Sequence, residues 1–83
     1  METSPTKQQS IILLENALQD LNSQLLPKER TKIAVSAKVS HSTLLHYLNG
    51  TVKEIDTAKK IIDAARKIIK KREQEVKDFV NAI

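Results

Sequence analysis

Two histidines with a serine beside them are the side chains of this chain with the most versatile chemistry. His41, Ser42 and His46 lie close together, and imidazole and hydroxyl groups can bind metals, take part in catalysis or form hydrogen bonds. A shared metal is disfavoured because His41 and His46 stand about 140° apart around a helix, unlike a pair spaced by four residues. The chain has no cysteine and no acidic cluster beside the histidines. We therefore expect no metal and no cofactor.

The rest of the chain offers little support for catalysis. It has a single glycine, so a glycine-rich phosphate loop is absent. No nucleophile stands at helical spacing from a base, and no carboxylate pair lies on an apolar face. We expect a protein that is not an enzyme.

Composition limits both the fold and the compartment. A chain of 83 residues corresponds to one small domain, residues 1–83. One glycine and two prolines leave few turn residues for a β-sandwich or barrel, and one tyrosine and one phenylalanine imply an aliphatic core. No apolar run approaches the ~18 residues of a membrane span, and the first ten residues lack the pattern of a signal peptide. We expect an all-α cytoplasmic protein, associated with the nucleoid of a bacterium or, if a phage encodes it, in the host cytoplasm.

Apolar spacing and capping residues predict four helices, near residues 5–24, 28–37, 40–49 and 56–81. Ser4 and Pro5 have the composition of a helix start, and Pro27 separates the first two helices. Ser40 and Asp56 are suitable N-caps for the third and fourth. The first and last helices are long, and the apolar stripe of the last runs to the final residue, interrupted only by an arginine, Arg72.

The segment "KIAVSAKVSHSTLLHYLNG", residues 32–50, has the spacing of a helix-turn-helix motif. Ala34 is small enough for close helix packing, and Ala37 and Val39 bracket the turn. Leu44, Tyr47 and Leu48 are expected to face inward, and Gly50 suits a left-handed position after the second helix. The turn position that most often holds glycine holds Lys38, where a positive φ would cost about 1 kcal/mol.

From about Lys32 to Lys67 the chain resembles the DNA-binding headpiece of the lactose-repressor family and, more loosely, phage Cro-type repressors. The resemblance is carried by "VS..T" and "YLNG" at the two ends of the third helix and by "TAKKIIDAARKI" after it. The departures are Lys38, a long helix ahead of the motif and the lack of a sugar-binding domain, so no small-molecule ligand is inferred. The resemblance implies sequence-specific binding of double-stranded DNA by a small, repressor-like transcriptional regulator of phage or cellular origin.

Carried over position by position, the resemblance places the helix at residues 40–49 in the major groove. It implies that base edges are read by His41, Ser42, Leu45 and His46, although Leu45 fits a contact within the protein or a dimer equally well. It implies phosphate contacts from Arg30, Lys32, Lys38, Ser40, Thr43, Asn49 and Lys53. The base-reading set lacks arginine, glutamine and asparagine, so we expect modest direct readout. Residues 1–27 carry a net charge of −2 and residues 28–83 a net charge of +6, which favours the later helices as the side that meets a polyanion.

Surplus apolar residues near both ends of the chain predict a contact with a partner. These residues are Ile12, Leu13, Val76, Phe79, Val80 and Ile83. A two-fold homodimer would bury them, and coverage of the last helix by the first within one chain is the competing explanation. The alternative function is a non-enzymatic protein–protein interaction module, such as an adaptor, a scaffold or a phage structural component.

Overall fold

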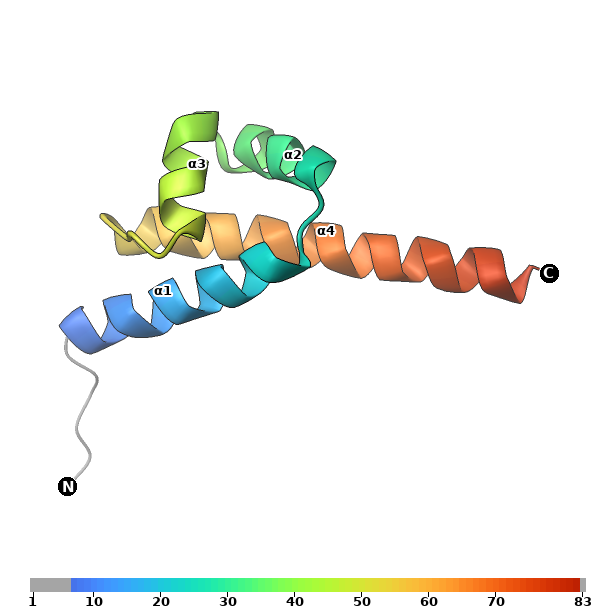
Figure 1. The fold of residues 1–83 in the computed structure, drawn as a ribbon, viewed down its shortest axis with the longest axis horizontal. Helices are drawn as coiled ribbons and strands as arrows, with labels where there is room; N and C mark the ends of the chain where they lie inside the picture. The colour runs from blue at the N-terminus through green and yellow to red at the C-terminus, as the bar shows by residue number, and fades with distance from the viewer. Residues whose placement is uncertain (1–6, 83) are drawn as a thin grey trace, which may run out of the picture.

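The computed structural model describes residues 7–82, which form four helices and no strand. They are α1 (Lys7–Gln24), α2 (Pro27–Ala37), α3 (His41–Leu48) and α4 (Ile55–Asn81) (Figure 1). The predicted all-α fold with long first and last helices is confirmed. The expected start at Ser4 and Pro5, like Ile83 at the other end, lies outside the described residues.

Helix α4 forms the long axis of the molecule, and the other three helices gather around its N-terminal half (Figure 1). α1 and α2 both pack against α4, and α3 packs against α1 and α2. The side chains that are almost completely buried are Leu18, Ile33, Leu44, Leu48 and Ile61. Each contributes about 1.5–3 kcal/mol through removal of its apolar surface from water. The core is therefore aliphatic, as expected, with Tyr47 as its aromatic member.

One N-cap prediction is wrong. Helix α4 begins at Ile55, with Glu54 at the N-cap position, so Asp56 lies inside the first turn and does not cap it. The backbone N–H of Glu54 donates to the hydroxyl oxygen of Tyr47 at 3.0 Å. This bond to a buried side chain holds the chain where it enters α4, and Asp56 still lies near the positive end of the helix dipole.

The arginine that interrupts the apolar stripe of α4 has a buried partner. The Nη1 of Arg72 lies 2.6 Å from Oε1 of Glu29, and its Nη2 donates to the carbonyl oxygen of Gln24 at 2.9 Å. The same oxygen of Glu29 accepts the backbone N–H of Leu26 at 2.9 Å, which caps the start of α2. Arg72 therefore joins the end of α1 and the start of α2 to the middle of α4.

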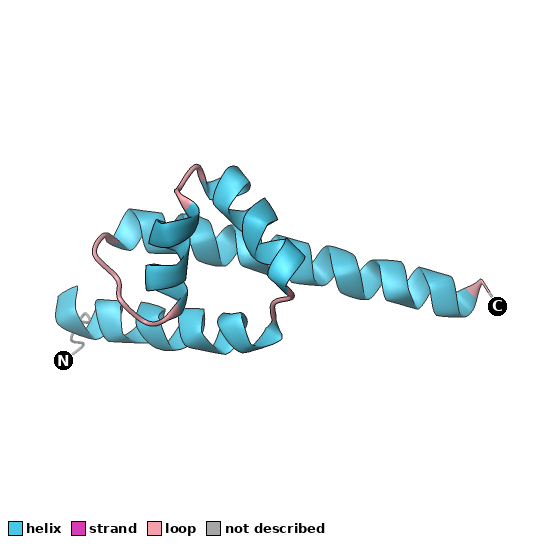
Figure 2. Ribbon diagram, turned by 45° about the horizontal axis from the view of Figure 1, so that its top comes forward, coloured by secondary structure: helices cyan, strands magenta, loops and turns pink. Residues whose placement is uncertain are grey.

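Beyond this point α4 extends away from the other helices, as both views of the ribbon show (Figures 1 and 2), and Glu75 still lines a hollow with residues of α2. We call residues 73–81 the C-terminal arm. Its apolar side chains Val76, Phe79 and Val80 are 58%, 71% and 58% exposed. Coverage of these three residues by the first helix is therefore ruled out, because α1 lies beside the opposite half of α4.

Candidate nucleic-acid interface

The turn between α2 and α3 begins with a left-handed residue although it lacks glycine. Lys38 has φ 58° and ψ 44°, and it is the one non-glycine residue with a positive φ in the described chain. The backbone N–H of Val39 donates to the carbonyl oxygen of Ala34 at 3.0 Å, and that of Lys38 donates to Val35 at 3.2 Å. These bonds satisfy carbonyls at the end of α2 and offset a conformational cost of about 1 kcal/mol.

Helix α3 starts at the predicted cap. The Oγ of Ser40 accepts the backbone N–H of Thr43 at 3.1 Å, and its hydroxyl donates to Oγ1 of Thr43 at 2.8 Å. The hydroxyl hydrogen of Thr43 remains able to donate outward. The first turn of α3 therefore presents polar groups and backbone N–H groups, the arrangement that suits contact with a phosphate.

The two sides of α3 differ as the motif predicts. Leu44, Tyr47 and Leu48 are buried in the core. The four expected base-reading residues are exposed, namely His41, Ser42, Leu45 and His46. Leu45 is 39% exposed, so its side chain is accessible both to a base methyl group and to another protein chain. The outward side of α3 thus offers polar side chains that no core packing requires.

Helix α1 holds the segment that follows α3. The amide Nε2 of Gln19 donates to the carbonyl oxygen of Asn49 at 3.1 Å, and the carboxylate of Glu15 accepts the N–H of Val52 at 3.2 Å. Between them Gly50 has φ +97°, and a Cβ there would collide with the side chain of Gln19. Sequence reasoning missed this support, for which the only signal is that Glu15 and Gln19 share one side of α1.

The structure brings some of the expected phosphate contacts together. Thr43 and Lys53 line one hollow of about 220 Å³ where α3 faces the start of α4. The expected base-reading residue His46 lines the same hollow, together with Thr51, Thr57 and Glu54. Lys38 and Ser40 lie at the turn beside the first residue of α3. The side chains near the N-terminus of α3 and those after its C-terminus therefore flank the same exposed surface.

Two expected phosphate contacts lie elsewhere. Lys32 lines a hollow between α2 and α4 with Lys71 and Glu75. Arg30 is half-buried, and its Nε and Nη2 donate to Oδ1 of Asn22 at 3.1 and 2.9 Å. The guanidinium of Arg30 therefore joins α2 to α1, which is a structural role, and Lys32 lies beside α4.

The motif itself carries no negative side chain, although Glu54 lines the hollow beside α3. No aspartate or glutamate occurs between Arg30 and Lys53, so neither α3 nor the turn carries a negative side chain. Glu54 is the nearest acidic residue along the chain, beside Lys53. The basic residues of the motif thus have a single acidic neighbour in that hollow, a charge balance that favours contact with a polyanion.

Metal sites and membrane-spanning helices were also sought in the described part of the chain. Residues 7–82 contain no group of three or more metal-ligating side chains and no helix long and apolar enough to cross a membrane. Comparisons of the chain with protein-family models, with characterised proteins and with solved structures found no match.

Proposed function

We propose that this chain binds double-stranded DNA with α3 in the major groove and acts as a small cytoplasmic transcriptional regulator of the repressor type. The observation that carries the proposal is the outward side of α3, where His41, Ser42 and His46 are exposed on a motif with a left-handed turn residue. An imidazole or hydroxyl group at such a position can form hydrogen bonds with base edges. Phosphate contacts would come from Lys38, Ser40, Thr43, Asn49 and Lys53.

Phosphate contacts can be tested by the dependence of affinity on salt. Binding of random-sequence duplex DNA should weaken steeply between 50 and 200 mM salt, because each neutralised phosphate releases condensed counterions. Lys53→Ala should weaken binding to all duplexes alike and lower the magnitude of the logarithmic salt slope by about 1. Lys77→Ala is the matched control, since it removes the same charge from the arm, at the opposite end of α4, and should leave the slope unchanged.

An affinity independent of salt, or an equal effect of the two substitutions, would contradict the proposed docking of α3.

Base reading can be tested with a duplex selected from a random pool. His46→Ala and Ser42→Ala should each weaken binding to the selected duplex by about 1 kcal/mol, the size of a single hydrogen bond, and change non-specific binding much less. The measurement is a pair of titrations, on the selected and on a scrambled duplex, for each variant. A ratio of affinities that His46→Ala leaves unchanged would show that α3 does not read the sequence.

We further propose that the regulator is a two-fold homodimer. Ile12, Leu13, Val76, Phe79 and Val80 are all exposed in the single chain, and a soluble chain rarely leaves large apolar groups uncovered together without a partner. The same exposed arm favours the second candidate function, a protein–protein interaction module, in which the partner is a different protein. Salt-independent or absent DNA binding would favour that candidate.

A further inference from the structure

The C-terminal arm has a defined chemical character. It presents Val76, Phe79 and Val80 to solvent, and it carries Glu73, Glu75 and Asp78 against a single lysine, Lys77. It is thus an amphipathic acidic helix end. A complementary surface would need an apolar floor and a cationic rim.

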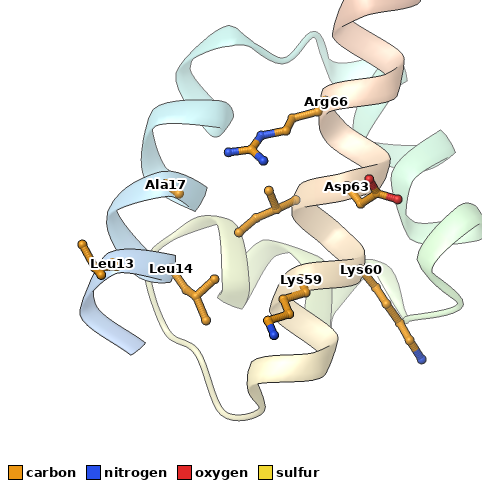
Figure 3. A pocket seen from close by; sticks show the side chains of 8 residues that line it. Leu13, Leu14, Ala17, Lys59, Lys60, Asp63 and Arg66 are labelled. Atoms are coloured by element: carbon orange, nitrogen blue, oxygen red, sulfur yellow. The ribbon is translucent and has the colours of Figure 1, made fainter. Parts of the chain in front are cut away.

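A hollow with that character lies between α1 and α4 (Figure 3). Its volume is about 560 Å³. The apolar side chains that line it are Leu13, Leu14, Ala17 and Ile62, and the charged ones are Lys59, Lys60, Arg66 and Asp63. Figure 3 shows the α1 side chains on one flank and Lys59 and Arg66 projecting from the α4 flank. Leu13 is 62% exposed, so this surface, like the arm, lacks a cover.

We infer that the hollow between α1 and α4 receives the C-terminal arm of a second copy of this chain. The inference rests on the proposed homodimer and specifies its interface. Apolar residues of the arm would cover Leu13 and Leu14, and the acidic residues of the arm would lie beside Lys59, Lys60 and Arg66, where opposite charges attract.

The geometry of α4 requires that the two surfaces meet between copies. The hollow lies beside residues 59–66 of α4 and the arm beyond residue 72, so their centres are separated by roughly 24 Å of continuous helix. An arm cannot fold back onto its own hollow without a break in α4. Two α4 helices that run antiparallel, with a two-fold axis level with about Lys70, bring each arm to the other copy's hollow. One symmetry operation satisfies both contacts and closes the assembly.

The charge distribution along α4 selects the antiparallel orientation. Arg66, Lys67, Lys70, Lys71 and Arg72 follow one another without an acidic residue among them, and the acidic arm comes next. Parallel helices in register would place one acidic arm beside the other. In the antiparallel pair, residues 73–81 of one copy lie along residues 59–67 of the other, which include Lys59, Lys60, Arg66 and Lys67, while the lysines nearest the axis lie beside their own counterparts. The antiparallel orientation therefore brings the acidic arm beside basic side chains and removes the repulsion between the two arms.

The mass of the protein in solution tests the homodimer. Light scattering should give twice the single-chain mass of 9.4 kDa for the parent protein. Phe79→Asp should keep the single-chain mass up to a concentration at least tenfold higher than the one at which the parent dimerises. Val35→Asp is the matched control, because Val35 is 75% exposed on α2, away from both surfaces, and that variant should keep the doubled mass. A parent that stays at 9.4 kDa at tens of micromolar overturns the inference and leaves the DNA-binding proposal standing.

Cross-linking distinguishes the proposed interface from other dimers, since the chain has no cysteine of its own. Leu13→Cys and Val80→Cys both alter exposed positions, so each variant should fold. A mixture of the two proteins should form a disulfide-linked heterodimer under mild oxidation, at least tenfold faster than either protein alone. Rapid linkage of Val80→Cys to itself would show that the arms pair with one another and would overturn the inference. A heterodimer that binds no DNA would support the interface and contradict the proposed function.

Discussion

Replacing Glu29 with alanine is expected to lower the free energy of unfolding by about 3 kcal/mol. Glu29 is 7% exposed, and one of its carboxylate oxygens accepts hydrogen bonds from the guanidinium of Arg72 and from the backbone N–H of Leu26. Alanine would leave a partly buried positive charge and a helix N-terminal donor without their acceptor. The expected loss is at the lower end for a buried ion pair because the side chain of Arg72 is 30% exposed, and water can solvate it in part.

Two control substitutions separate the charge from the cap. Glu29→Gln keeps an oxygen for the N–H of Leu26 and should cost about 1 kcal/mol. Arg72→Met keeps much of the packing but leaves the buried carboxylate of Glu29 with the N–H of Leu26 as its remaining donor. The loss in the free energy of unfolding should therefore fall between those of Glu29→Ala and Glu29→Gln. Urea unfolding followed by circular dichroism measures all three. A loss below 0.5 kcal/mol for Glu29→Ala would show that this contact does not form in solution.

The position of this ion pair links stability to the proposed function. Arg72 marks the point where α4 leaves the bundle and the arm begins, and its bonds to Glu29 and to Gln24 fix α2 relative to the arm. Because α3 follows α2 through a three-residue connection, the same bonds help to orient α3, the helix that we propose reads bases, relative to the proposed dimer contact. A total stability of about 5–15 kcal/mol is usual for such domains, so the pair accounts for a substantial fraction.

The helices were predictable because their signals are local. Pro27 and Ser40 act on the backbone next to them, and a period near 3.6 residues identifies the buried sides of α3 and α4 without any knowledge of the fold. The spacing of the motif identified Lys38 as the turn position that most often holds glycine, but it did not determine whether lysine would adopt a positive φ there. The same periodicity placed His41, Ser42 and His46 outward.

Contacts between distant parts of the sequence were not predictable. Glu15 with Val52, Gln19 with Asn49 and Arg72 with Glu29 depend on the angles at which helices cross, which a single sequence does not specify. The start of α4 was misplaced for a related reason. Asp56 has the better capping side chain, but the bond from Glu54 to Tyr47 decides where the chain turns into the helix. Arg30 shows the same limit, since its partner Asn22 lies on another helix.

The parent protein is expected to bind two inverted half-sites one DNA turn apart at least about a hundredfold more tightly than one half-site. Antiparallel α4 helices centred near Lys70 place their N-terminal ends, beside which α3 lies in each copy, roughly 45 Å apart. Successive major grooves on one side of B-DNA recur every ~34 Å. The two separations are of the same order, and once both α3 helices of a dimer enter adjacent grooves the second contact is intramolecular.

Three duplexes built from the selected half-site measure this effect: a single half-site, the inverted pair one turn apart, and the pair with about five additional base pairs, which turn one site to the opposite side. The parent should prefer the second duplex alone. Phe79→Asp should bind all three with the affinity and salt slope of a single half-site, because the substitution leaves α3 and the proposed phosphate contacts unchanged and removes the proposed link between two copies. If Phe79→Asp kept the preference for the one-turn pair, the two α3 helices would be held together by a surface other than the arm, even if α3 itself reads the DNA.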